Sequence, residues 1–311
     1  MAKRNTATVW VVGTGPRGLG FARMEGEREG CAVEYADMRD IQNGKVSLPA
    51  GSDVYVVPQD EHYPLLPSFF PVLCLSPEVN IHVAESEDAS FRFPYFRGER
   101  VKRGGIVFLE FPYRAMGVFP SLLKRFFDIV FCSCLLLLLL PVLLVSAVLV
   151  KCSSKGPVFY SQTRIGFRRK TFEIYKFRSM REGAEQNGPL LSKKGDPRIT
   201  EWGEIMRKYR IDELPQLWNV LKGDMALVGY RPEREFFIHE IVKVSPYYTL
   251  LYALKPGITS LGITTFGYAE NVEQMLVRLE EDMAYWRCLS LKEDLRVCGK
   301  TVKVVLYGIG K

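Results

Sequence analysis

The sequence predicts an α/β module at the N-terminus, then an apolar helix hairpin, then a mostly α (α+β) domain. Three observations predict this order. Four short apolar segments have the length and composition of strands, at 9–12, 32–36, 53–57 and 79–83. A long uncharged run follows them, and the segments after it repeat apolar residues at helical spacing. A chain of 311 residues is long enough for two domains, each with its own core.

The first strand-like segment leads into a glycine-rich loop. Gly13, Gly15 and Gly18 form the G-x-G-x-x-G pattern of a Rossmann dinucleotide-binding unit, and Asp37 stands near the expected position of an acidic ribose ligand. The pattern alone is weak, and Pro16 within GPRGLG makes a poor helix start. Two interpretations therefore stay open, a functional nucleotide site or a degenerate structural module.

The uncharged run covers residues 129–150, which is long enough to cross a bilayer core. Pro141 lies near its middle, where proline kinks a helix because it lacks a backbone N–H donor. Basic residues flank both ends, with Lys124 and Arg125 before the run and Lys151 and Lys155 after it. The positive-inside rule favours keeping both flanks in the cytoplasm. A re-entrant hairpin satisfies both facts, and a kinked spanning helix is the alternative.

The overall charge predicts an anionic partner. The net charge of +7 suits a phosphorylated substrate, a nucleotide or a lipid headgroup surface. Nucleic acid is not expected, because no recognised nucleic-acid-binding motif is present. Seven cysteines without C-x-x-C pairs, beside only three histidines, argue against structural zinc and indicate reduced thiols facing the cytoplasm. The apolar stretch VWVVG is too short for a signal peptide.

The stretch RIDELPQLWNVLKGD carries the strongest chemical signal. It places two adjacent carboxylates, Asp212 and Glu213, at the head of a short helix that Pro215 suits and Gly223 ends. Asp212 is the expected N-cap residue of this helix. A carboxylate at the positive end of the helix dipole tends to stay ionised, as a nucleophile or metal ligand must. The alternative is that both acids only cap the helix.

Basic residues stand on both sides of this stretch. The segment TFEIYKF alternates like a strand, which places Lys176 and Arg178 on one face. Arg207 precedes the acids in a helical stretch and is placed to balance their charge. Arg231 stands beside Pro232 in MALVGYRPE, where a short strand and a rigid turn suit bidentate phosphate binding. These five residues are the candidate substrate contacts.

Several motifs stand in one order along the chain. They are KRFFD at 124–128, GPVFYSQTRIGFRRKTFEIYKFRSM at 156–180, DPRIT at 196–200, DELPQLWNVLKGDMALVGYRPE at 212–233 and KPGIT at 255–259. In that order they resemble the bacterial sugar transferase family, the monotopic polyprenyl-phosphate phosphoglycosyl transferases. The resemblance implies a membrane-associated transferase domain over 121–311 with a re-entrant helix at 126–151. It also implies a shortened Rossmann-like, degenerate dinucleotide-binding-like domain over 1–115.

The activity that the resemblance implies is transfer of a sugar-1-phosphate from a UDP-sugar to undecaprenyl phosphate. UMP is released, and the product begins exopolysaccharide, capsule or O-antigen (lipopolysaccharide) synthesis. The resemblance makes Asp212 the covalent nucleophile and Glu213 the ligand of a Mg²⁺ cofactor. It places the catalytic domain on the cytoplasmic face of the bacterial inner membrane, and a homodimer is compatible with the sequence. The residues expected to shape the membrane hairpin are Lys124, Arg125, Asp128 and Pro141.

The chain departs from the family pattern at several places. Leu140 replaces the usual serine before Pro141, Tyr230 replaces the first proline of the usual VGPRP turn, and the segment 260–268 lacks the usual tryptophan and glutamine. Two other functions are therefore weighed. One is an NAD-dependent sugar-nucleotide oxidoreductase that uses the N-terminal glycine-rich loop. The other is a catalytically inactive membrane scaffold.

Overall fold

The computed structural model describes residues 8–13, 15–27, 32–49, 52–73, 79–86, 96–112, 116, 118–184, 190–192, 195–267 and 269–308. The chain divides into two compact units, Met1–Ala115 with Ile241–Ala253, and Met116–Glu240 with Leu254–Lys311. The predicted mixed α/β architecture is confirmed. Five of the cysteines lie in the described residues and are free thiols, whereas Cys31 and Cys74 lie outside them.

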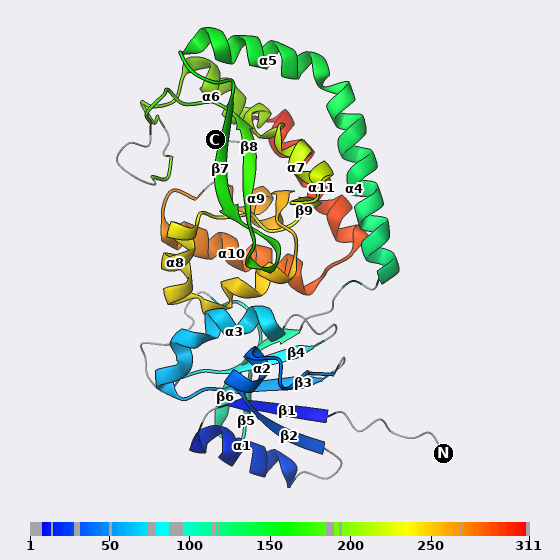
Figure 1. Cartoon of the computed structure of the whole chain (residues 1–311), viewed down its shortest axis with the longest axis vertical. Coiled ribbons are helices and arrows are strands. Elements are labelled where there is room, and N and C mark those ends of the chain that lie inside the picture. The colour runs from blue at the N-terminus through cyan, green and yellow to red at the C-terminus, as the bar shows by residue number, and fades with distance from the viewer. Residues whose placement is uncertain are drawn as a thin grey trace. The chain divides into compact units, whose positions relative to one another are not determined.

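The N-terminal unit is built on one sheet of six strands in the order β2-β1-β3-β4-β6-β5 (Figure 1). The strands are β1 (Thr8–Gly13), β2 (Ala32–Asp37), β3 (Asp53–Val57), β4 (Asn80–Ala84), β5 (Arg100–Arg103) and β6 (Ile106–Pro112). The first four are parallel to one another, and β6 runs antiparallel to both β4 and β5. The four strands expected from the sequence are observed, each within one residue of its expected bounds.

The helices of this unit are α1 (Pro16–Gly26), α2 (Met38–Gln42), the 3₁₀ helix η1 (Asp60–Leu65) and α3 (Leu66–Leu73). Helix α1 begins at Pro16, so the expectation of a poor helix start there is wrong. Proline is favoured at the first helical position, because its missing N–H would have no partner there and its fixed φ suits the helix. Phe21 of α1 packs on Tyr55 and Phe108, with ring centroids 5.2 and 4.9 Å away.

A later segment of the chain completes the N-terminal unit. The 3₁₀ helix η5 (Pro246–Ala253) packs with α3, and the ring of Tyr247 lies 5.5 Å from that of Phe111 and 5.7 Å from that of Phe96. Tyr247, Leu250 and Leu251 are all at most 1% exposed. The core of the unit therefore depends on two separate stretches of sequence.

The C-terminal unit begins with two apolar helices, α4 (Val118–Leu138) and α5 (Leu140–Ser153), which are bent by 62° where they meet. Pro141 lies in the first turn of α5, where a proline removes no helical hydrogen bond. Helix α4 starts at Val118, earlier than the expected start of the hairpin at 126. Among the described helices none is long and apolar enough to cross a membrane alone, although the bent pair together meets both criteria.

The remaining elements follow the helix pair in the sequence, and several of them pack against its buried face. They are β7 (Phe159–Ile165), the 3₁₀ helix η3 (Phe167–Arg169), β8 (Thr171–Phe177), α6 (Glu201–Lys208), the 3₁₀ helix η4 (Ile211–Glu213), α7 (Gln216–Lys222), β9 (Ala226–Val228), α8 (Glu235–Val244), β10 (Gly257–Thr259), α9 (Leu261–Thr265), α10 (Val272–Arg287) and α11 (Leu291–Leu306). Helix α4 runs beside α7, and α5 lies across α6 (Figure 1).

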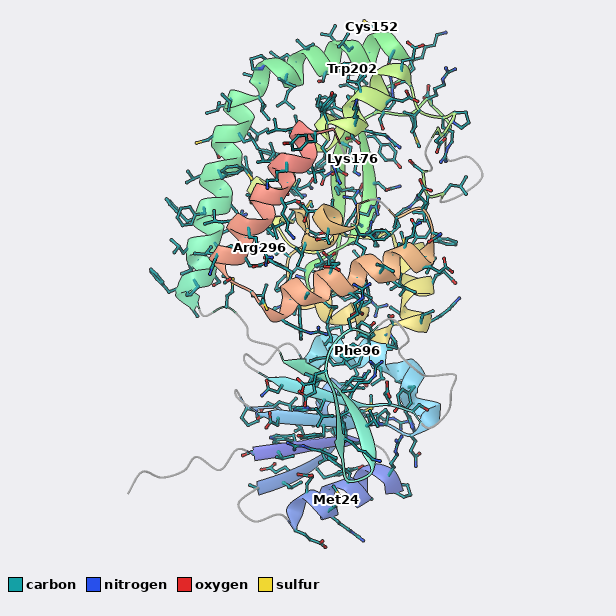
Figure 2. All side chains as sticks on the ribbon, turned by 180° about the vertical axis from the view of Figure 1, so that it is seen from behind. Met24, Phe96, Cys152, Lys176, Trp202 and Arg296 are labelled. Carbon is teal, nitrogen blue, oxygen red and sulfur yellow. The ribbon has the colours of Figure 1, made fainter. Side chains whose placement is uncertain are left out.

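One face of the helix pair is packed and the other is exposed. Cys132 of α4 is buried with Leu217 and Val220 of α7, and Val150 of α5 is buried with Phe177. Trp202 of α6 packs beneath α5 in the same cluster (Figure 2). The opposite face carries exposed side chains that include Phe126, Phe127, Val130, Phe131, Leu137, Leu138, Leu144, Val145 and Val148.

Candidate active site

Lys176 and Arg178 lie at the end of β8, as the alternation of TFEIYKF predicts. Strand β8 pairs antiparallel with β7, and Phe177 at its end is buried against Val150 of α5. Successive side chains of a strand face opposite sides, so Lys176 points away from this cluster. It lies inside the C-terminal unit, with Nζ 3.1 Å from Oε1 of Glu213 (Figure 2).

Arg207 is held beside the end of β8 by a close approach of α6. Thr200 caps α6 by accepting from the N–H of Gly203, and the carbonyl of Ser179 accepts from the N–H of Thr200 at 3.1 Å. A Cβ at Gly203 would lie 2.1 Å from the Ser179 oxygen, so a glycine is needed there. Arg207 donates to the hydroxyls of Ser179 at 2.8 Å and Ser192 at 2.6 Å. These bonds fix its guanidinium in the pocket described below.

The two adjacent acids lie in a 3₁₀ turn before α7. Arg210 enters the turn with a left-handed φ of 60°, and α7 begins only after Pro215, which occupies the N-cap position. The prediction that Asp212 caps this helix is therefore wrong, because the extra turn moves the helix start three residues along the chain. Gly223 ends α7 at φ 99°, as expected from the sequence.

Asp212 is a buried carboxylate with an exposed fraction of only 4%. Its Oδ1 has no hydrogen-bond partner among the described residues. Burial, together with the charge of Glu213, raises the pKa of Asp212 to about 6, and the charges of Lys176, Arg207 and Arg210 limit the rise. The sequence analysis expected the helix dipole to keep Asp212 ionised, which would lower its pKa. In the structure, burial raises that pKa instead. At pH 7 the carboxylate is still mostly ionised, and it is poorly solvated.

Glu213 is the anionic centre around which the basic residues gather. Its Oε1 accepts from Lys176 at 3.1 Å and from Arg231 at 2.9 Å, and its Oε2 accepts from Arg210 at 3.2 Å. Burial by itself would raise the pKa of Glu213, but the charges of Arg231, Lys176 and Arg210 outweigh burial and hold the pKa well below its usual range. Glu213 therefore stays ionised, and its negative charge is offset.

Arg231 is positioned by the turn that follows β9. The backbone N–H of Arg231 donates to Oδ2 of Asp282 at 3.3 Å, and Oδ1 of the same acid accepts from the N–H of Gly262 at 2.8 Å. Asp282 thus joins the turn to the start of α9. Burial raises the pKa of Asp282 to about 6, although its hydrogen bond from Gly262 and the charge of Arg278 oppose the rise.

One pocket of about 600 Å³ brings most of the candidate residues together. Lys176, Arg178, Arg207, Asp212 and Arg231 all line it, with further lining from Tyr160, Gln162, Arg164, Ser179, Arg181, Glu182, Ser192, Glu233, Arg234, Phe237, Met275 and Arg278. Glu213 and Pro232 are not among the described lining residues. Glu213 reaches the pocket through its ion pairs, and the carbonyl of Pro232 accepts from Arg164 at 3.2 Å.

The sequence-based candidates leave out several charged residues of the pocket wall, among them Arg164, Glu233 and Arg278. Arg278 of α10 donates to Glu233 in a very short contact, and Nη1 of Arg164 lies 3.6 Å from the same carboxylate. Arg278 and Asp282 stand four residues apart on α10, whose buried apolar residues include Met275, Leu276, Leu279 and Met283. In the sequence, Arg278 and Asp282 are charged residues on the apolar face of a helix, and this pattern could have marked both as candidate site residues.

The root of the helix pair is fixed by the residues expected to shape the hairpin. Lys124 lies 2.5 Å from Asp294 of α11 and also donates to the carbonyl of Val228. Arg125 donates to the last carbonyls of α7, at Val220 and Leu221, which satisfies that helix end. Asp128 is buried, and burial raises its pKa, opposed by the charge of Lys124.

The N-terminal glycines form a separate candidate site. Gly13 and Asp37 are paired in the register of the parallel strands β1 and β2. The carboxylate of Asp37, however, accepts from the N–H of Arg39 and caps α2. A Cβ at Gly15 would lie 2.0 Å from the amide nitrogen of Gln59, so the space beside this glycine is filled by a side chain. These contacts occupy groups that an oxidoreductase would use for its cofactor.

A scan against protein-family models matches residues 119–308 to the bacterial sugar transferase family. The match covers more than half of the chain and all the described residues that line the pocket. The chain belongs to the bacterial sugar transferase family. The resemblance drawn from the sequence motifs is thereby confirmed.

Curated relatives of this family are similar over the same region. A UDP-N-acetylgalactosamine-undecaprenyl-phosphate N-acetylgalactosaminephosphotransferase of Aeromonas hydrophila is 40% identical over 190 residues, which cover 61% of this chain and 45% of the relative. A UDP-glucose:undecaprenyl-phosphate glucose-1-phosphate transferase of Klebsiella pneumoniae is 38% identical, with 58% and 39% covered. One of Caulobacter vibrioides is 39% identical, with 60% and 70% covered. The matched region thus spans less than half the length of the first two relatives.

Proposed function

We propose that this chain transfers a sugar-1-phosphate from a UDP-sugar to undecaprenyl phosphate and releases UMP. The observation that carries the proposal is Asp212, a buried carboxylate in a strongly basic pocket with one oxygen that has no hydrogen-bond partner in the described part of the chain. Eight basic and three acidic side chains are among the described lining residues, so the pocket suits an anionic substrate. The names of the relatives specify this class of reaction. Such a transfer would begin exopolysaccharide, capsule or O-antigen synthesis.

The proposed reaction has two steps that share one phosphorus atom. In the first, a carboxylate oxygen of Asp212 bonds to the phosphorus next to the sugar, the bond to the bridging oxygen breaks, and UMP leaves with that oxygen. In the second, a phosphate oxygen of the lipid acceptor attacks the same phosphorus. The bond to Asp212 breaks, and the carboxylate is regenerated.

The charges around Asp212 support this chemistry. A carboxylate that attacks a diphosphate must overcome repulsion between two anions, so nearby cations are required. Arg207 and Lys176 line the pocket and lower the pKa of Asp212 against the larger effect of burial. Arg231 offsets Glu213 and is placed by its turn to reach a phosphate as well. The raised pKa of Asp212 still leaves it ionised at neutral pH, as a nucleophile must be.

Magnesium is the proposed cofactor, and the residues present fit only one mode of binding it. No group of three or more His, Cys, Asp or Glu side chains that would hold a metal ion occurs in the described parts of the chain. Mg²⁺ is commonly held by one or two carboxylates together with substrate phosphates, and Oδ1 of Asp212, which has no partner among the described residues, fits that mode. Both oxygens of Glu213 accept from Lys176, Arg231 and Arg210, so Glu213 would have to exchange one of these partners for the ion. Bound there, Mg²⁺ would neutralise charge on the diphosphate.

The site is proposed to face the inner leaflet of the bacterial inner membrane from the cytoplasm. Support comes from the bend at Pro141, from the basic residues at both ends of the helix pair, and from its exposed apolar face. Other helices of the unit add exposed apolar side chains, namely Ile205 of α6, Trp218 of α7, and Leu295, Val302 and Leu306 of α11. A helix pair that enters and leaves the same leaflet would bring a lipid acceptor to Asp212.

The proposal is tested by incubating the purified full chain in lipid nanodiscs with undecaprenyl phosphate, Mg²⁺ and a panel of UDP-sugars. Release of UMP with one or more sugars is the expected result, and Asp212→Asn is the matched control that should release none. A folded, inserted wild type that releases no more UMP than Asp212→Asn with any sugar would favour the inactive scaffold instead.

A further inference from the structure

Arg178 carries a buried positive charge and forms no ion pair with a carboxylate in the described part of the chain, although Glu182 lines the same pocket. The side chain of Arg178 is 7% exposed and lines the pocket. Its Nη2 donates to the carbonyls of Val150 at 3.2 Å and Ser154 at 2.7 Å, at the end of α5. Its Nε and Nη1 are buried and have no hydrogen-bond partner among the described residues.

A buried cation of this kind favours the binding of an anion. Leaving a charge and its donors unpaired away from water is costly, whereas an anion that fills the site recovers charge-assisted hydrogen bonds. Lys176 and Arg231 of the same pocket differ, because each is already paired with Glu213. Arg178 also differs from Arg207, whose guanidinium already donates to two hydroxyls, because Nε and Nη1 of Arg178 have no partner in the described part of the chain. Arg178 can therefore offer free donors to a ligand at the C-terminal end of α5.

The guanidinium of Arg178 is held in place before any ligand arrives. Gly156 has a left-handed φ of 116°, and a Cβ at this position would lie 2.3 Å from Nη1 of Arg178. The two carbonyls hold Nη2 from the other side, and the next residue, Ser179, is fixed by α6 through its backbone. A pre-placed donor group binds its ligand without a further ordering cost.

The position of Arg178 indicates which phosphate it takes. Its hydrogen bonds tie it to the end of α5, the apolar helix whose outer face is exposed, whereas the cations on Glu213 lie beside Asp212. We infer that Arg178 binds the phosphate monoester of the lipid acceptor, whose hydrocarbon chain would follow α5. The inference rests on the proposed function and assigns the diphosphate of the UDP-sugar to the Asp212 side of the pocket.

In the second step the acceptor phosphate attacks the phosphorus held on Asp212. Its oxygen forms the new P–O bond while the bond to the Asp212 carboxylate breaks, so the product is a lipid diphosphate sugar and a free carboxylate. Arg178 offsets the charge of the attacking phosphate and takes no proton. The first step, in which UMP leaves, does not involve this subsite.

The test separates the two phosphates by separating the two steps. Full turnover gives the KM for undecaprenyl phosphate in nanodiscs, and exchange of labelled UMP into UDP-sugar without lipid reports the first step alone. Arg178→Gln should raise the KM for undecaprenyl phosphate at least about tenfold, because a lost charged hydrogen bond costs roughly 1.5–3 kcal/mol. The exchange rate should fall far less. Lys222→Gln removes an exposed charge outside the described pocket lining, and should change neither.

Two further arms keep the inference testable if Arg178→Gln does not fold. Gly156→Ala pushes the guanidinium aside and should show the same selective rise in KM. In the wild type, inorganic phosphate should compete with the lipid acceptor and inhibit exchange much less. Two outcomes would place the nucleotide diphosphate at Arg178 instead. One is that the variants lose exchange and turnover equally, and the other is that inorganic phosphate inhibits exchange as strongly as it inhibits turnover. A wild type with neither exchange nor turnover would overturn the proposed function itself.

Discussion

Lowering the pH below 6 should protonate Asp212 and stop the first step of the reaction. Burial and Glu213 raise the pKa of this carboxyl from 3.8 to about 6. At pH 5 only about a tenth of such a group is ionised, so kcat/KM for the UDP-sugar should fall about tenfold between pH 7 and pH 5. An aspartate with an ordinary pKa would lose less than about a tenth of its activity over that range.

The assay is UMP release at low UDP-sugar concentration, because kcat/KM for the first substrate of a two-step reaction reports the first step. Arg207→Gln removes a cation that lowers the pKa of Asp212, so the acid limb should move to higher pH. Lys222→Gln, which alters an exposed pair with Asp224 outside the described pocket lining, should leave the limb in place. A wild-type limb near pH 4, or one that Arg207→Gln does not move, would refute this reasoning.

Three other predictions concern the nucleophile, the N-terminal unit and the helix pair. Asp212→Asn should lose several orders of magnitude in rate. Its thermal unfolding midpoint at pH 8 should nevertheless equal or exceed that of the wild type, because a raised folded-state pKa means that ionised Asp212 destabilises the fold above pH 6; a lower midpoint would contradict the raised pKa. In lipid nanodiscs, a chain starting at Ser121 should bind more hydrophobic dye than the full chain, since it exposes Tyr247, Leu250 and Leu251 of η5; equal dye binding by the two chains would refute this. Cysteines near 120 and 155, in a background without native thiols, should be labelled only from the cytoplasmic side, and periplasmic labelling of one would establish a spanning helix.

Local signals allowed the sequence to predict many elements closely. TFEIYKF alternates apolar and polar residues, and β8 covers that segment, Thr171–Phe177. The strand expected at 53–57 is observed as β3, Asp53–Val57. In both cases the pattern within the segment decides the structure, so no distant contact was needed to predict it.

Features set by distant contacts were harder to predict. The start of α7 depends on how the 3₁₀ turn around Asp212 buries against its neighbours, so the expected N-cap was wrong. The place of η5 in the N-terminal unit depends on α3, which is far away in the sequence. Arg278 reaches the pocket because α10 packs against the turn of Arg231, and no local pattern encodes that packing.

The candidate residues of the pocket were named from the sequence mainly through chemistry and motif order. Lys176, Arg207 and Arg231 were chosen as cations near an acidic pair, and the structure places all three on one pocket with Asp212. Which cation pairs with which acid was not accessible from the sequence. Arg231 forms an ion pair with Glu213, whereas Arg178 forms none with the described carboxylates, and this contrast depends on distances of a few ångströms.

The central claim is that Asp212 forms a covalent bond to the sugar phosphate before the lipid acceptor takes part. The most direct measurement is exchange of labelled UMP into UDP-sugar by the purified chain with Mg²⁺ and no undecaprenyl phosphate. Because the first step is complete in itself and reversible, label should appear in UDP-sugar with the wild type and not with Asp212→Asn. A preparation that turns over with the lipid acceptor yet shows no exchange without it would contradict the covalent account and indicate direct transfer.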